Sequence, residues 1–250
     1  MEFVKVGELS SVIRSDVAMS YGGVVLDDEI KGYMTLLVKG REVSGNAIEA
    51  IDTTYGVMAL SQRMAVEPLE VEFILKGETD VAYYRQFEKL MKILDKKENV
   101  EIKFEDDEAC FFGRLGEFEA LEANVNNQVL GMFQIFRETP YKYSIEKESN
   151  GTIQITDREL EVFEIKLNTD APVSGTIISN GAQEIRIIEP FTVGDNVVLD
   201  LRDGKAWKNG NRFDHAIAID SDYENFKIQS ADVVASSQSS LVIKYRERWR

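Results

Sequence analysis

Strict alternation of apolar and polar side chains over residues 69–76 restricts this segment to a β-strand with one buried face. Successive side chains of a strand point to opposite sides, so every second residue shares a face. The apolar positions are Leu69, Val71, Phe73 and Leu75. Residues 100–104 repeat the pattern. Residues 132–136, in contrast, are mostly apolar at odd-numbered and at even-numbered positions, so both strand faces are apolar. The sequence therefore predicts half-buried strands at 69–76 and 100–104, and a strand buried on both faces at 132–136.

A segment with helical periodicity lies between the first two of these strands. Thr79 or Asp80 can cap its start, because a side-chain oxygen there accepts the free amide hydrogens of the first turn. Apolar residues then recur at helical spacing, at Val81, Tyr84, Phe87, Leu90, Met91 and Leu94. The order strand, helix, strand, strand predicts an α+β N-terminal domain in which one amphipathic helix packs on a sheet.

The C-terminal part of the chain shows short strands separated by turns and no helical pattern. Asp203-Gly204 and Asn209-Gly210 supply the positive φ angles that tight hairpins need. Regularly spaced strands of this kind predict a β-sandwich, and the whole chain is predicted to be mostly β. Residues 146–151 are charged and then turn-like, so we expect a linker there. The predicted domains are residues 1–145 and residues 146–250.

Histidine and cysteine, two residue types that often support catalysis, are scarce. His215 and Cys110 are the single histidine and the single cysteine. No Gly-x-Ser-x-Gly elbow accompanies His215, a histidine-based zinc site normally needs more than one histidine, and no glycine-rich phosphate motif is present. Carboxylate pairs of the glycosidase kind carry almost no information among 44 acidic residues. We predict a protein that is not an enzyme, with no cofactor, no metal and an inert buried thiol.

Two acidic segments are interpreted as turns. Residues 220–224 begin like a calcium loop, but Asn225 stands where that loop needs glycine. Residues 105–108 are four consecutive acids, and neighbouring like charges favour exposure. We therefore expect residues 105–108 at the tip between two strands.

The net charge of −15 bears on partners. No stretch gathers the lysine and arginine that phosphate binding needs, so stable nucleic-acid binding is not expected. Glu2, Lys5 and Glu8 interrupt the apolar core that a signal peptide would have, and no apolar run approaches the ~20 residues that span a bilayer. We expect synthesis in a cytoplasm and no membrane insertion.

The elements form an ordered series along the chain. The first half carries the strand at 69–76, the helix, residues 102–107, Phe112-Gly113-Arg114-Leu115 and Thr139-Pro140-Tyr141-Lys142-Tyr143. The second half carries residues 194–200, Trp207-Lys208-Asn209-Gly210, residues 220–223 and Tyr245-Arg246-Glu247-Arg248-Trp249. This series resembles the distal tail protein (Dit) family of siphophages and related prophages of Gram-positive bacteria.

The resemblance implies a function and a set of partners. The C-terminal domain would be a galectin-like β-sandwich, and the N-terminal domains would form a ring, expected to be a hexamer, around an axial channel for DNA in transit. The ring would be an adaptor between the tail tube protein and a tail-associated hub protein, with receptor-binding or side-fibre proteins at its periphery. Its place would be the tail tip of the virion, after assembly in the cytoplasm of the bacterial host.

Two sets of residues are predicted to matter for this role. The family-motif positions, with a structural role, are Pro140, Tyr141, Lys142 and Tyr143. The segment 41–61 lies in the ring-forming half and is long for a simple connection, so we expect it to make inter-subunit contacts. Its candidate residues are Arg41, Tyr55 and Gly56.

A second hypothesis belongs to another class of function. The C-terminal sandwich could be a carbohydrate-binding module that contacts host cell-wall saccharide. Trp207 would be its candidate stacking residue, because an aromatic ring can lie against a sugar face. Aromatic residues of a β-sandwich, however, more often serve a core or an interface.

Overall fold

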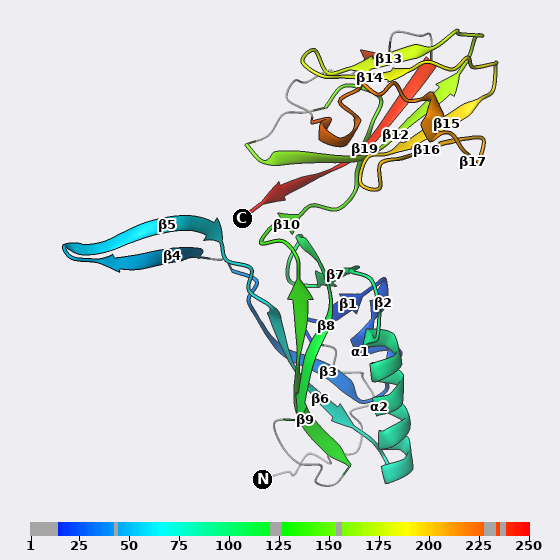
Figure 1. Cartoon of the computed structure of the whole chain (residues 1–250). Helices are drawn as coiled ribbons and strands as arrows, with labels where there is room; N and C mark the ends of the chain where they lie inside the picture. The colour runs from blue at the N-terminus through cyan, green and yellow to red at the C-terminus, as the bar shows by residue number, and fades with distance from the viewer. Residues whose placement is uncertain (1–14, 43–44, 121–126, 154–156, 228–233, 236–238) are drawn as a thin grey trace. The chain divides into compact units, whose positions relative to one another are not determined.

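The computed structural model describes residues 15–42, 45–120, 127–153, 157–227, 234–235 and 239–250. The chain divides into two compact units, one over Met1–Lys142 together with Arg250 and one over Tyr143–Trp249 (Figure 1). Each unit has its own hydrophobic core. Strands predominate in both units, which confirms the predicted mostly-β fold class.

The first unit is built on an antiparallel sheet with the strand order β3-β6-β9-β8-β7-β1-β2. The strands are β1 (Met19–Tyr21), β2 (Val24–Val25), β3 (Tyr33–Lys39), β6 (Leu69–Lys76), β7 (Val100–Phe104), β8 (Cys110–Ala120) and β9 (Gln128–Arg137). Two helices accompany it, α1 (Leu26–Glu29) and α2 (Asp80–Leu94). The four apolar residues of β6 are fully buried, as their alternation predicts.

Helix α2 has the predicted N-cap but a different buried face. The Thr79 hydroxyl oxygen accepts a hydrogen bond from the Ala82 amide at 3.1 Å, which confirms the cap. The prediction that Val81 and Tyr84 are in the apolar stripe is wrong, because both are exposed. Residues spaced four, three and four apart share one side of a helix. Counting from Leu94 back through Leu90 and Phe87 therefore leads to Tyr83, which is buried.

Strand β9 is buried on one face only, so the prediction of burial on both faces is also wrong. Phe133 and Ile135 have no exposed surface, whereas Phe136 is half-exposed. An antiparallel sheet needs cover on one face only. The other face of β9 leaves Phe136 available for contacts.

Between β3 and β6 the chain forms a separate hairpin (Figure 1). Its strands are β4 (Asn46–Thr53) and β5 (Gly56–Met64), and within the described residues they pair only with each other. The predicted long loop at 41–61 is therefore mostly regular structure. We call residues 46–64 the arm.

The second unit is a β-sandwich. One sheet has the order β17-β16-β15-β12-β19, with β11 also on β19, and the other has the order β14-β13-β18. The strands of the first sheet are β11 (Lys147–Ser149), β12 (Glu159–Thr169), β15 (Asn196–Asp200), β16 (Lys205–Lys208), β17 (Asn211–Arg212) and β19 (Ser239–Trp249). Those of the second are β13 (Thr176–Ser179), β14 (Glu184–Ile187) and β18 (Val234–Ala235). Buried side chains of both sheets, including Ile165, Leu199, Ile178 and Ile185, form its core.

Local turn chemistry shapes the second unit. Asn209 and Gly210 adopt φ angles of 50° and 80° between β16 and β17, and Gly204 adopts 62° between β15 and β16, as the hairpin turns require. The segment 146–151, predicted as a linker, contains regular structure. Its residues 147–149 form β11 and pair with β19, because the charged side chains of a strand edge can stay in solvent while the backbone pairs.

Three short elements complete the description. Strand β10 (Lys142–Tyr143) lies where the two units divide. The 3-10 helices η1 (Asp214–Ala216) and η2 (Tyr223–Asn225) belong to the second unit.

Candidate functional site

The arm exposes apolar side chains on two strands that, among the residues that the structure describes, pair only with each other. Tyr55 at its tip is 99% exposed, and Ile51 lies directly across from Met58. Its exposed large hydrophobic residues are Ile48, Ile51, Tyr55, Val57, Met58 and Leu60. Contiguous exposed apolar surface marks interaction sites, and unpaired strand edges are ready to accept another chain. The arm therefore has the character of an assembly element.

The turn of the arm holds two of the residues predicted from the sequence. Tyr55 and Gly56 sit at the tip, where Gly56 has a φ of 140° that disfavours other residues. The Thr53 hydroxyl donates to the Gly56 carbonyl at 2.9 Å and closes the turn. The tip thus presents a fully exposed tyrosine on a defined turn.

We call the residues where the chain enters and leaves the arm, 40–42, 45–46 and 64–69, its root. The two sides of this root lie close together. Gly40 has a φ of 82°, and a Cβ added there would lie 2.2 Å from the Pro68 carbonyl oxygen. The chain segments that enter and leave the arm therefore touch at this point. Only glycine allows both this approach and this conformation.

Arg41 contributes to the root within its own subunit. Its two terminal nitrogens donate to the two carboxylate oxygens of Asp106 at 2.5 and 2.8 Å. The guanidinium also lies 5.1 Å from the centre of the Phe104 ring. The hydrogen bond to Arg41 holds the pKa of the Asp106 carboxyl below its ordinary value. This paired arrangement fixes the first residue of the root against the turn between β7 and β8.

A second arginine, which the sequence did not single out, lies on the inner side of the root. Arg137 at the end of β9 is 3% exposed. It donates to the Gly40 carbonyl at 3.1 Å and to the Tyr141 carbonyl at 3.2 Å. Its guanidinium lies 5.0 Å from the centre of the Phe111 ring. An arginine directly after the apolar residues of a predicted strand is the sequence signal that could have identified it.

Two of the family-motif residues, Tyr141 and Lys142, contact residues at this root. Pro140, Tyr141 and Lys142 are partly buried and Tyr143 is buried. The Lys142 ammonium lies 4.0 Å from a carboxylate oxygen of Asp107. The acidic segment 105–108 is thus the predicted turn between β7 and β8, and two of its acids face cations. Arg41, Tyr141 and Lys142 meet at the root, whereas Tyr55 and Gly56 lie at the far end of the arm.

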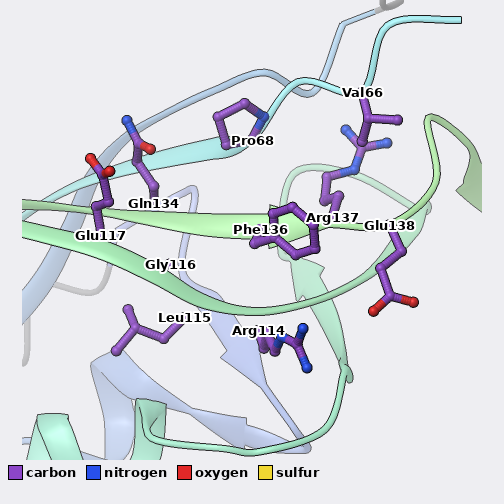
Figure 2. A pocket seen from close by; sticks show the side chains of 10 residues that line it. All are labelled: Val66, Pro68, Arg114, Leu115, Gly116, Glu117, Gln134, Phe136, Arg137 and Glu138. Atoms are coloured by element: carbon purple, nitrogen blue, oxygen red, sulfur yellow. The ribbon is translucent and has the colours of Figure 1, made fainter.

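A groove of about 820 Å³ adjoins the root. Figure 2 shows its lining, which comes from the exit of the arm and from β8 and β9. Its lining residues are Val66, Pro68, Arg114, Leu115, Gly116, Glu117, Gln134, Phe136, Arg137 and Glu138. The half-exposed Phe136 ring lies 5.8 Å from the Arg114 guanidinium. The pairing of β8 with β9 shifts register between Leu115 and Phe118, an irregularity of the kind that bends a strand locally.

Of the residues considered for chemistry, Cys110 lies in the first unit, and His215 and Asp220 lie in the second. Cys110 is buried, as predicted, and His215 is exposed in η1. Asp220 pairs with Arg186 at 2.9 Å. Within the described part of the chain, no three His, Cys, Asp or Glu side chains gather as metal ligands. Neither of its α-helices has the length and apolar character needed to cross a membrane.

Trp207 is partly buried on β16 of the second unit. The Arg212 guanidinium lies 5.4 Å from the centre of its ring. The two residues face each other across β16 and β17. One side of the indole is therefore occupied by a cation of the same chain.

Comparisons with known proteins find a family model for the C-terminal part of the chain and solved structures that share its fold. Residues 142–249 match the family model of the siphovirus-type tail component, C-terminal domain. The fold matches the crystal structure of the Dit protein of phage SPP1, described as a paradigm of the hub adsorption apparatus in phages that infect Gram-positive bacteria. That match has a TM-score of 0.73 and 17% identity, and it covers 94% of this chain and 100% of that one.

Two structures of the phage p2 baseplate in its activated conformation are also similar. With Ca and with Sr, the TM-score is 0.57, the identity is 10% and 9%, and the match covers 88% of this chain and 91% of the other. No curated protein matches the sequence. The family model and the fold together confirm the resemblance to the distal tail protein family that the ordered motifs indicated.

Proposed function

We propose that this chain, a Dit-like structural component of a siphophage tail tip, is a ring subunit whose arm joins each copy to the next. The observation that carries the proposal is the exposed apolar arm on the first unit. The relatives are tail and baseplate proteins, which supports a structural role in a tail.

A ring closes when each copy uses one patch to bind a different patch on its neighbour. An arm suits this head-to-tail geometry because it is one element that reaches in one direction. Eight residues of β4 span ~26 Å at about 3.3 Å per residue. That length is enough to bring Tyr55 onto the surface of an adjacent copy. We expect six copies in the ring, from the family resemblance.

The ring would surround an axial channel for DNA in transit. Six copies at −15 each carry −90. Acidic side chains on the channel wall would repel phosphates and let DNA pass without being bound. A channel wall rich in lysine and arginine would contradict this part of the proposal.

The ring would act as an adaptor and not as an enzyme. One face would bind the tail tube protein and the other the tail-associated hub protein, with receptor-binding or side-fibre proteins at the periphery. Such contacts need complementary surfaces and no cofactor. The protein would be assembled in the cytoplasm of the bacterial host and would reside at the tail tip of the virion.

Removal of the arm tests the proposal. In one variant, residues 46–64 are replaced by a short Gly-Ser connection, which leaves the sheet order of the first unit intact. Mass photometry would compare this variant with the full chain, alone and mixed with the tail tube and hub proteins. We expect closed oligomers of the full chain and monomers of the variant. Equal oligomer formation by both would refute the role of the arm.

A further inference from the structure

We infer that Arg137 is a positioning residue that ties the root of the arm to the segment by which the chain leaves the first unit. The inference rests on the proposed role of the arm in joining subunits. It assigns a task to a side chain that neither belongs to the arm nor contacts its tip.

Arg137 holds two chain segments with one guanidinium. It donates to the carbonyl of Gly40, the last residue before the chain turns toward the arm. It also donates to the carbonyl of Tyr141, in residues 138–145, which we call the exit segment. The two acceptor residues are far apart in the chain, and both offer main-chain carbonyl oxygens. The planar guanidinium holds its donors on separate nitrogens in fixed directions, so Nη1 and Nη2 bind one carbonyl each in a defined geometry.

The surroundings make this link rigid. The guanidinium lies against the Phe111 ring at 5.0 Å, and Phe111 packs edge-on against Phe104 with ring centres 6.1 Å apart. Arg41 lies against Phe104 at 5.1 Å. Two arginines and two phenylalanines therefore form one continuous stack beneath the root of the arm.

A second link runs in parallel on the surface. Arg41 at the root binds Asp106, and Lys142 in the exit segment faces Asp107. The two acids are neighbours in the turn between β7 and β8. The root and the exit segment are thus connected twice, through the buried Arg137 and through the acidic turn.

These connections determine how a mechanical force on the arm passes through a subunit of the ring. When a neighbouring copy holds the arm, force on the arm reaches Gly40 at its root. Arg137 passes that displacement to the Tyr141 carbonyl, and so to the connection with the second unit. Contact between subunits and the position of the exit segment are therefore linked through Arg137, in parallel with the link through the acidic turn.

Hydrogen-exchange mass spectrometry on the purified full chain tests this inference without requiring ring formation. In Arg137→Met, amides of the arm root (residues 40–42, 45–46 and 64–69) and of the exit segment (residues 138–145) should exchange faster together. The expected change is about tenfold or more, the factor that corresponds to one lost charge-assisted hydrogen bond. Arg114→Met is the matched control, because it removes another arginine that contacts a phenylalanine ring.

Gly40→Ala provides a second test from the opposite side. The added Cβ would collide with the Pro68 carbonyl and shift the root. Faster exchange should then appear in residues 138–145, and adding Gly40→Ala to Arg137→Met should raise exchange there no further, because methionine binds neither carbonyl. Faster exchange at the root alone in both Arg137→Met and Gly40→Ala would overturn the inference. If exchange at the root and in residues 138–145 rises together but the full chain forms no ring, the result would count against the proposed function and not against this inference.

Discussion

Replacing Val57 and Met58 with serine should weaken assembly and leave the subunit as stable as before. Val57 is 70% and Met58 51% exposed in the isolated chain. Full burial of such a side chain stabilises by roughly 1.5–3 kcal/mol, so covering the exposed fraction contributes about 1–2 kcal/mol for each. The pair would therefore supply about 2–4 kcal/mol per contact. Since 1.4 kcal/mol corresponds to a factor of ten, the dissociation constant should rise roughly 30- to 700-fold.

The stability of the subunit separates this effect from simple unfolding. Exposed substitutions usually change the free energy of unfolding by no more than about 0.5 kcal/mol. Sedimentation velocity over a range of concentrations would measure assembly, and urea unfolding would measure stability. Ile219→Ser is the matched control, because this residue is 105% exposed and lies in the second unit. Unchanged assembly in the double variant, or equal weakening in the control, would refute the reasoning.

Three further predictions concern the core, a carboxylate and the sugar hypothesis. Tyr21→Phe removes a hydroxyl that donates to the Leu94 carbonyl at 3.1 Å and accepts from the Leu115 amide at 3.0 Å. Urea unfolding should show a loss of about 1–3 kcal/mol, and an unchanged midpoint would count against these bonds. The Asp195 carboxyl has a lowered pKa, chiefly because a backbone amide donates to it, so its stabilisation is complete above its ordinary pKa of 3.8 and is lost as the pH falls toward the folded value. Below pH 3.8 the Tm of Asp195→Asn should therefore fall less steeply than that of the unchanged chain; parallel curves would contradict this. On a glycan array the full chain should bind no saccharide, whereas binding that Trp207→Ala abolishes would favour the carbohydrate-binding hypothesis.

Local patterns in the sequence predicted the elements that local physics determines. The alternation of 69–76 gave the buried face of β6 correctly, and Thr79 gave the start of α2. Asn209-Gly210 gave a hairpin turn, since its two positive φ angles depend on those two residues alone. These features need no knowledge of distant parts of the chain.

The arm escaped prediction as a hairpin for a physical reason. Strand periodicity arises when one face is buried, and residues 46–64 have no buried face in the isolated chain. Apolar and charged residues therefore mix along both strands without strict alternation. The length of the segment indicated a special role, but its regular structure could not be inferred.

The root of the arm could not be predicted because it depends on contacts between distant residues. Arg41 reaches Asp106 across 65 positions, and Arg137 reaches Gly40 across 97. Each residue alone has many compatible partners in a sequence with 44 acids. Only the folded sheet brings the end of β3, the acidic turn and the end of β9 to one place.

Electron microscopy of the full chain mixed with its tail tube and hub proteins tests the central claim most directly. The account predicts closed six-fold rings with a central hole, in which the arm of each subunit lies on the next one. Persistent monomers in the presence of both partners, or rings in which the arms remain in solvent, would contradict it.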